Sequence, residues 1–298
     1  MPRWLSLVLF LSVCCPCVFA QESTLYIQPP RSATDATQVY YHDLLQRMLP
    51  ADMHIKTIPR AVTQERSLQL LNSNGLTIAW AGTNSRRESN FIPIRVPLFS
   101  GLLGVRMAVI RSDDKDKFDA ISSSEQLKQL VACQGDQWPD SDILEANGYT
   151  VERVTKFDLM YRMLKAGRCD YFPRSITEIY GELKNRKDPA FMAYESILLS
   201  YPFPMYFFTG RDHRALAYLL EERLRAFALS GELKKYMTTH TATSPAFPLS
   251  RFKDARVFYL VNPDLPPATP VSDKGLWLMP PSEPGSERDS STPALGWD

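Results

Sequence analysis

The sequence predicts an α/β protein of two lobes in tandem, each a mostly parallel sheet with flanking helices and with a ligand cleft between the lobes. Short apolar runs typical of buried strands alternate with runs of helical periodicity. This alternation stops after residue 110 and then begins again. The order strand-helix-strand-helix-strand favours parallel strands covered by helices. A third observation, an aromatic run at 201–208 broken by Pro202 and Pro204, predicts a strand that returns the chain to the first lobe.

The first lobe is expected to have strands at 25–28, 54–58 and 76–80 and helices at 38–49 and 63–72. Prolines end the first strand and the first helix, and an Asn-Gly pair follows the second helix. The middle strand alternates apolar and polar residues, as a half-buried strand does.

The second lobe repeats this pattern. We expect strands at 106–110, 130–133, 149–154 and 169–172, with helices that start at 124, end before 147 and span 158–166. After the aromatic strand, the apolar face of 215–229 predicts a long amphipathic helix, and a last helical turn or two is expected at 233–237.

Residues 1–20 have the three parts of a secretory signal peptide: the single charge Arg3, an apolar run, and small residues at Val18 and Ala20. An uncleaved anchor is the alternative, but the run is shorter than the roughly 20 residues that cross a bilayer. A lipoprotein is disfavoured because Val13 precedes Cys14, where a small residue is expected. We therefore expect a soluble, exported, periplasmic protein.

The remaining chain is expected to divide into lobe I (21–107), lobe II (108–200) and a segment that returns to lobe I with its closing helices (201–261). Residues 262–298 are rich in Pro, Ser and acidic residues, a composition that predicts a disordered tail. The 34 basic residues nearly balance the 33 acidic ones, so the basic excess of a nucleic-acid-binding protein is lacking.

Two of the five cysteines, Cys133 and Cys169, lie outside the predicted signal peptide. In an oxidising compartment such a pair is a candidate disulfide. The alternative is two separate buried thiols, because free cysteine packs as a small hydrophobe. Four scattered histidines and no close His/Cys spacing predict no metal site, and we expect no cofactor.

Candidate ligand-binding residues follow the predicted strands, because ligands of open α/β sheets bind beyond the carboxyl ends of strands and between domains. Arginine suits carboxylate recognition, and aromatic side chains supply flat walls. These residues could instead have structural roles only: the arginines could lie in solvated turns, the aromatic residues could pack in the core, and Arg174 could form a local ion pair with Glu178. The candidates are Trp80, Thr83, Arg86, Arg87, Arg106, Gly135, Asp136, Trp138, Tyr171 and Arg174.

No nucleophile elbow, phosphate loop, zinc-protease motif or calcium loop is present in the sequence. Glu178 is a lone carboxylate in the predicted cleft, which is weak support for acid–base chemistry. We therefore expect a protein that is not an enzyme and has no catalytic residues.

From about residue 24 to 260, the order and spacing of several short motifs resemble the type II periplasmic solute-binding proteins of ABC transporters, in particular the polar-amino-acid group. The motifs are Thr83-x-x-Arg86, Ser124-x-Gln-Leu-Lys128 with Gln134-Gly135, Gly167-Arg-Cys-Asp170, and the helical stretch Leu216 to Tyr236.

The resemblance implies that Arg86, or its neighbour Arg87, binds a ligand carboxylate, supported by Thr83 and by the Gly135-Asp136 turn of the second lobe. The chain departs from the group at Ser175, where an Asp that holds the ligand amine is often found, which puts an α-amino acid in doubt.

By this resemblance, we expect a monomeric periplasmic protein that captures a small polar, carboxylate-bearing solute by hinge closure and delivers it to an ABC permease. A sensory module that acts through a membrane sensor is one alternative. The other is a dehydratase-like enzyme on the same scaffold that uses Glu178 or Glu88.

Overall fold

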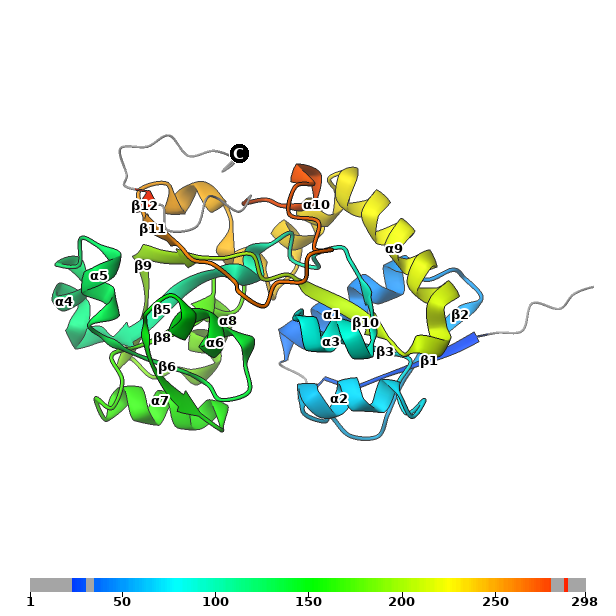
Figure 1. The fold of residues 1–298 in the computed structure, drawn as a ribbon, viewed down its shortest axis with the longest axis horizontal. Coiled ribbons are helices and arrows are strands. Elements are labelled where there is room, and N and C mark those ends of the chain that lie inside the picture. The colour runs from blue at the N-terminus through cyan, green and yellow to red at the C-terminus, as the bar shows by residue number, and fades with distance from the viewer. Residues whose placement is uncertain (1–22, 31–34, 280–286, 289–298) are drawn as a thin grey trace, which may run out of the picture.

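The computed structural model describes residues 23–30, 35–279 and 287–288, and Figure 1 shows them as two α/β lobes side by side. The predicted signal peptide lies outside the described residues and stays a prediction. Among the described residues, none of the helices is both long and apolar enough to cross a membrane.

The first lobe contains two small sheets. Strands β1 (Ser23–Ile27) and β2 (Met53–Thr57) are parallel, whereas β10 (Met205–Thr209) runs antiparallel between β3 (Ile78–Gly82) and β4 (Ile92–Ile94). Its helices are α1 (Ala36–Met48), α2 (Gln64–Leu71), α3 (Ser85–Asn90), α9 (Arg214–Leu229) and α10 (Glu232–Thr239).

Side-chain caps explain where three of these helices begin. Asp35, Thr63 and Asn84 each accept a hydrogen bond from a backbone N–H one turn into the helix, which satisfies a donor that lacks an intrahelical partner. The buried face of α1, which includes Tyr40 and Leu44, packs into the main core.

The second lobe is built on one sheet with strand order β12-β11-β9-β5-β8-β6-β7. Its parallel pairs are β6–β7, β6–β8 and β9–β11, and β5 runs antiparallel between β8 and β9. The strands are β5 (Val105–Arg111), β6 (Val131–Gly135), β7 (Thr150–Val154), β8 (Tyr171–Ser175), β9 (Phe191–Ser200), β11 (Arg256–Tyr259) and β12 (Glu287–Arg288). Its helices are α4 (Lys115–Asp119), α5 (Ser124–Lys128), α6 (Pro139–Ala146), α7 (Phe157–Lys165) and α8 (Ile179–Arg186).

Two chain segments cross between the lobes side by side. The first leads into β5 and the second leaves β9, and Tyr201 N donates to Gly104 O at 3.1 Å where they meet. Both lobes share one continuous hydrophobic core cluster. The crossing region is therefore a packed hinge.

Two features of the predicted domain organisation are corrected. The segment 201–261 returns to the first lobe through β10, α9 and α10, but it ends in β11, which pairs with β9 of the second sheet. The segment 262–279, predicted to be disordered, packs on the protein: Trp277 is 5% exposed and its Nε1 donates to Pro270 O at 2.8 Å. This Pro-rich segment is ordered because it buries two apolar side chains, the aromatic Trp277 and the aliphatic Leu276.

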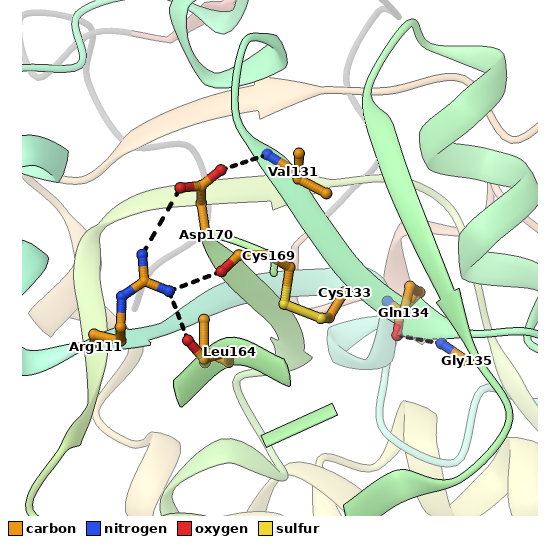
Figure 2. Close-up of a disulfide and its surroundings, with 8 residues drawn as sticks. All are labelled: Arg111, Val131, Cys133, Gln134, Gly135, Leu164, Cys169 and Asp170. Carbon is orange, nitrogen blue, oxygen red and sulfur yellow. Dashed lines mark hydrogen bonds and ion pairs between the residues drawn. A yellow bond between two sulfur atoms is a disulfide. The ribbon is translucent and has the colours of Figure 1, made fainter. Parts of the chain in front are cut away.

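Cys133 and Cys169 form a disulfide, with their Cα atoms 5.6 Å apart (Figure 2). Cys133 lies in β6, and Cys169 lies just before β8, the neighbouring strand. Close by, Asp170 accepts a hydrogen bond from Val131 N at 2.8 Å and pairs with Lys117 at 2.6 Å. The disulfide alternative of the sequence analysis is thus confirmed in the structure.

Removing the disulfide should destabilise the second lobe. With a sequence separation of 36, loop closure in the unfolded chain predicts a loss of about 3–4 kcal/mol in the free energy of unfolding. Urea unfolding of the Cys133→Ala/Cys169→Ala variant would measure this loss, and reduced wild-type protein should match the variant. Two reactive thiols in denatured, unreduced protein would contradict the disulfide.

Asp170 should make stability depend on pH. Burial alone would raise the pKa of Asp170, but Lys117, the Val131 N–H and Arg111 outweigh it, so the pKa is lowered overall. The stabilisation is then present above the unfolded pKa of about 4 and is lost as the pH falls through the folded pKa. Asp170→Asn should therefore lower the free energy of unfolding at pH 7 and differ little from wild type at pH 3. If the variant and wild type differ in the free energy of unfolding by the same amount at pH 7 and pH 3, Asp170 has a packing role only.

Candidate functional site

A cavity of about 460 Å³ lies between the lobes. The first lobe contributes α1 and α3 with the end of β3, and the second contributes β8 with the starts of α6, α7 and α8. The residues that line it and carry polar or aromatic groups include Gln38, Tyr41, Trp80, Arg87, Arg106, Trp138, Asp140, Phe157, Arg174, Glu178, Glu182 and Phe203. In the described part of the chain, no group of His, Cys, Asp or Glu has the makings of a metal site.

On the first lobe, a local network fixes the helix that carries Arg87. Thr83 Oγ1 donates to Glu88 Oε1 at 2.7 Å, and the other oxygen of Glu88 pairs with Arg95 at 2.6 Å. The cap Asn84 accepts a hydrogen bond from Arg87 N at 2.8 Å. These contacts fix the N-terminus and the middle of α3, and Arg87 lies between them.

Arg87 is a buried cation that has no counter-ion among the residues that the structure describes. It is 8% exposed, and its guanidinium donates to Gly82 O at 2.5 Å. Among the described residues, no carboxylate lies within ion-pair distance of it. Burial lowers the pKa of Arg87, and the more distant Glu65 and Asp140 only partly oppose this. A desolvated positive charge of this kind favours an anion beside it.

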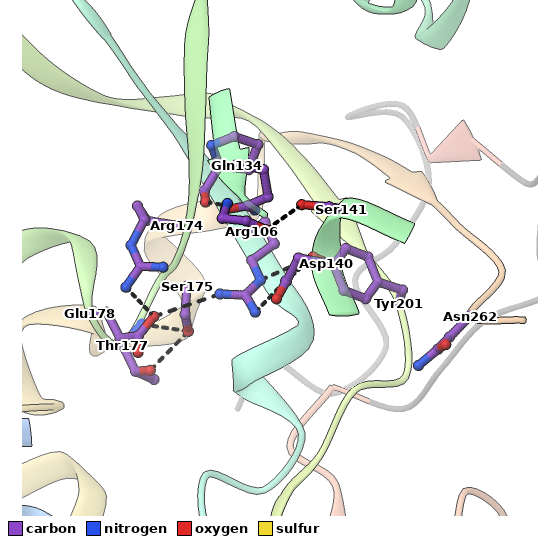
Figure 3. A network of polar contacts seen from close by, with 12 residues as sticks. Arg106, Gln134, Asp140, Ser141, Arg174, Ser175, Thr177, Glu178, Tyr201 and Asn262 are labelled. Atoms are coloured by element: carbon purple, nitrogen blue, oxygen red, sulfur yellow. Dashed lines mark hydrogen bonds and ion pairs between the residues drawn. The ribbon is translucent and has the colours of Figure 1, made fainter. Parts of the chain in front are cut away.

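On the second lobe, Arg106 is already neutralised by the protein. Figure 3 shows its guanidinium beside Asp140, with the ion pair at 2.5 Å and both side chains almost completely buried. Tyr201 Oη accepts from Arg106 Nε at 3.1 Å and donates to the same Asp140 oxygen at 2.6 Å. Burial, together with the charge of Asp140, raises the pKa of Tyr201 well above its usual value, so the phenol stays protonated.

Arg174 is neutralised in the same way by two glutamates of α8. It pairs with Glu182 at 2.5 Å and with Glu178 at 2.9 Å, and Arg106 lies 3.6 Å from Glu178 on its other side. The guanidinium also lies 5.1 Å from the centre of the Trp138 ring. Glu178 Oε2 accepts no well-aligned hydrogen bond from the described residues, although it is buried.

The structure brings five of the ten candidates to the cavity: Trp80, Arg87, Arg106, Trp138 and Arg174. Trp80 is almost wholly buried and stacks on Tyr41, with ring centroids 5.0 Å apart, so it forms the base of the cavity. Trp138 lies over Gly135, where a Cβ would come within 2.4 Å of the indole. Gly135 is thus needed for the packing of Trp138 and does not itself line the cavity.

The other candidates lie elsewhere. Arg86 is exposed and lines, with Asp136, a second and more polar groove of about 590 Å³ that meets the cavity at Arg87 and Pro139. Thr83 is buried and acts on α3 through Glu88. Tyr171 was expected at the mouth of the cleft, but it is buried in the second lobe against Phe118, because its strand position points into the core.

Sequence reasoning missed Asp140, Glu182 and Tyr201. Asp140 follows a proline at the start of a helix, where acidic residues are common, so its pattern indicated only a favourable helix N-terminus. Tyr201 was taken as part of a strand. Only the fold brings these residues to Arg106 and Arg174.

Of the two glutamates considered for an enzyme, Glu88 does not line the cavity and is paired with Arg95. Glu178 does line it, between Arg174 and Arg106. Desolvation raises the pKa of Glu178, and the two arginines act in the opposite direction.

Breaking the Arg106–Asp140 pair should be costly, because it leaves a buried charge with its main partner removed. Asp140→Asn is expected to lower the free energy of unfolding by about 3 kcal/mol. Asp142→Asn is the matched control on the same helix, since Asp142 pairs with Arg153 at the surface and should change stability by less than about 1 kcal/mol. Urea unfolding of both variants measures the difference, and equal effects would contradict the assigned role of Asp140.

No protein-family model matches the sequence, and no curated protein matches it either. Solved structures do. An ancestral arginine-binding protein bound to arginine has a TM-score of 0.54 at 13% identity, over 74% of this chain and 99% of that chain. An amino acid ABC transporter substrate-binding protein from Streptococcus pneumoniae, bound to L-arginine, has a TM-score of 0.53 at 14% identity, over 75% of this chain and 95% of that chain.

The periplasmic VFT2 domain of BvgS from Bordetella pertussis has a TM-score of 0.55 at 18% identity, over 73% of this chain and 92% of that chain. Identities this low establish the fold alone. The fold predicted from the sequence is thereby confirmed: the chain has the two-lobed α/β fold of the type II periplasmic binding proteins.

Proposed function

We propose that this protein captures a small polar solute that carries a carboxylate, by closing its two lobes on it, and delivers the solute to an ABC permease. The observation that carries the proposal is Arg87. Of the three arginines that line the cavity, Arg106 and Arg174 have carboxylates of the protein beside them, whereas Arg87 has none within ion-pair distance in the described chain. A ligand carboxylate would complete its charge balance in a site shielded from water.

The opposite wall of the cavity supports an amino acid, whose ammonium group needs an acceptor. Glu182 lines this wall with its side chain 21% exposed, so it could accept from a ligand ammonium while it pairs with Arg174. The arginine bound in two of the similar structures is in keeping with such a solute. The role usually given to an acid at position 175 would then fall to Glu182, because Ser175 bonds to Leu102 O and Thr177.

The proposed location is the periplasm, after cleavage of the predicted signal peptide, and the names of the similar structures are consistent with it. The protein would act as a binder without turnover. Glu178 pairs with Arg174 at 2.9 Å and lies 3.6 Å from Arg106, so its carboxylate contributes to the charge balance of this wall and we assign it no proton transfer.

A second function is favoured by one comparison. The similar structure from Bordetella pertussis is a periplasmic domain whose name refers to no transporter. A sensory module with the same cleft, which signals through a membrane partner, would use the same ligand contacts. A permease that takes up the bound solute would distinguish the two functions.

Binding should depend on Arg87 and not on its neighbour Arg86. In isothermal titration of the mature protein with a panel of amino acids and organic acids, we expect one class of solute to bind. Arg87→Ala should weaken that binding by roughly 30-fold or more, because it removes one partner of a buried charge pair worth about 2 kcal/mol or more. Arg86→Ala, exposed in the adjoining groove, should leave affinity within about threefold of wild type.

Circular dichroism would verify that both variants are folded. Equal affinity in wild type and Arg87→Ala would refute the carboxylate contact. Conversion of the bound solute into a product, abolished by Glu178→Gln, would refute the binder and establish an enzyme.

A further inference from the structure

We infer that the Pro-rich segment 260–279, here called the strap, ties the two lobes together and limits how far the cleft opens. The strap leaves β11 of the second lobe and crosses to the first, as the orange trace in Figure 1 shows. It is a third connection between the lobes, beside the two segments of the hinge.

The second lobe holds the start of the strap through one side chain. Asn147, which ends α6, donates from Nδ2 to Val261 O at 2.8 Å and accepts from Val261 N at 2.9 Å. This pair of bonds satisfies both backbone groups of Val261, so the strap begins firmly attached to the helix whose first turn lines the cavity. Asn262 then donates to Pro202 O in the hinge at 2.9 Å.

The first lobe holds the strap at three places, one of which is an ion pair between Asp273 and Arg225 of α9. Asp264 accepts from Ser85 N at 3.3 Å, and Ser85 Oγ donates to Asp264 O at 3.4 Å, at the start of the helix that carries Arg87. Further along, Trp277 lies on Gly101, where a Cβ would come within 2.2 Å of the indole, and Leu278 N donates to Ser100 O at 2.9 Å. The strap thus connects α6 to α3.

The short distance along the chain between the contacts at Val261 and Asp264 limits how far the two lobes can separate. Two residues, Asn262 and Pro263, lie between Val261 and Asp264, and even fully extended these three Cα–Cα steps span at most about 11 Å. The link is closed into a turn, in which Asp264 N donates to Asn262 Oδ1 at 3.2 Å and Leu265 N donates to Asn262 O at 3.3 Å, and Pro263 fixes its own φ angle. Asp264 also lines the outer groove between the lobes. If that groove widens, this turn must open or one of the two contacts must break.

The Ser85–Asp264 contact should break first, because its bonds are long and exposed, whereas those of Asn147 are short. With both contacts intact the lobes keep a narrow range of separation. Loss of either contact releases the cleft to open further.

The test uses the mature protein without ligand, so its outcome does not depend on the proposed function. Nitroxide labels at Arg66→Cys on α2 and Lys156→Cys before α7, both exposed on opposite lobes, report the separation by pulsed electron resonance. The native cysteines are paired and do not react. In Ser85→Ala/Asp264→Ala the distance distribution should broaden and shift to longer distances by several ångström.

Asn147→Ala should give the same shift from the other lobe, which a purely local effect on α3 would not produce. Asp264→Asn keeps the Oδ1 acceptor and should behave as wild type. Asp254→Ala, an exposed acid before β11, is the control for a lost charge. Distributions that stay unchanged in the double variant, while circular dichroism shows it folded, would overturn the inference, as would an equal shift in Asp254→Ala.

Discussion

A buried guanidinium requires a negative charge close by, and this requirement organises the cleft. Three arginines reach the cavity, and two of them are neutralised by carboxylates of the second lobe. These ion pairs tie together β5, β8, α6 and α8, the elements that form one wall of the site. On the opposite wall, the positive charge of Arg87 is not neutralised in this way. The arginines on the wall of the second lobe have carboxylate partners, whereas Arg87 on the wall of the first lobe has none among the described residues.

The fold was accessible from the sequence because it depends on periodicity. Alternating strands and helices, with caps and prolines at their ends, predicted most of the longer elements to within a few residues, whereas β4, β9, β11, α3 and α4 were not predicted. The candidate site was only partly accessible. Arg87 and Arg174 follow strands and were found by their position, but the sequence did not distinguish Arg86 from Arg87. That distinction depends on which side of a six-residue helix faces the cleft.

Residues that act as internal counter-ions were the hardest to predict. Asp140 and Glu182 lie on helices whose acidic residues suit the surface equally well, and only packing brings them to Arg106 and Arg174. The prediction for the Pro-rich segment was wrong for a different reason, which is that composition alone does not show whether a segment packs on the rest of the protein. Its composition predicts disorder, yet a few buried side chains and main-chain contacts are enough to hold it, because prolines restrict the unfolded chain and reduce the entropy lost on ordering.

The disulfide has a mechanical consequence. It joins β6 to the start of β8, and the far ends of these two strands lead to Trp138 and Arg174. Relative sliding of the two strands is therefore blocked by a covalent bond from the middle of β6 to the residue two positions before β8, and the aromatic and cationic parts of this wall keep one fixed spacing. A solute that fits the wall must match that spacing as it is. Adjustment to solutes of different length is left to rotation of the lobes, which makes the hinge, and not the wall, the adjustable part of the receptor.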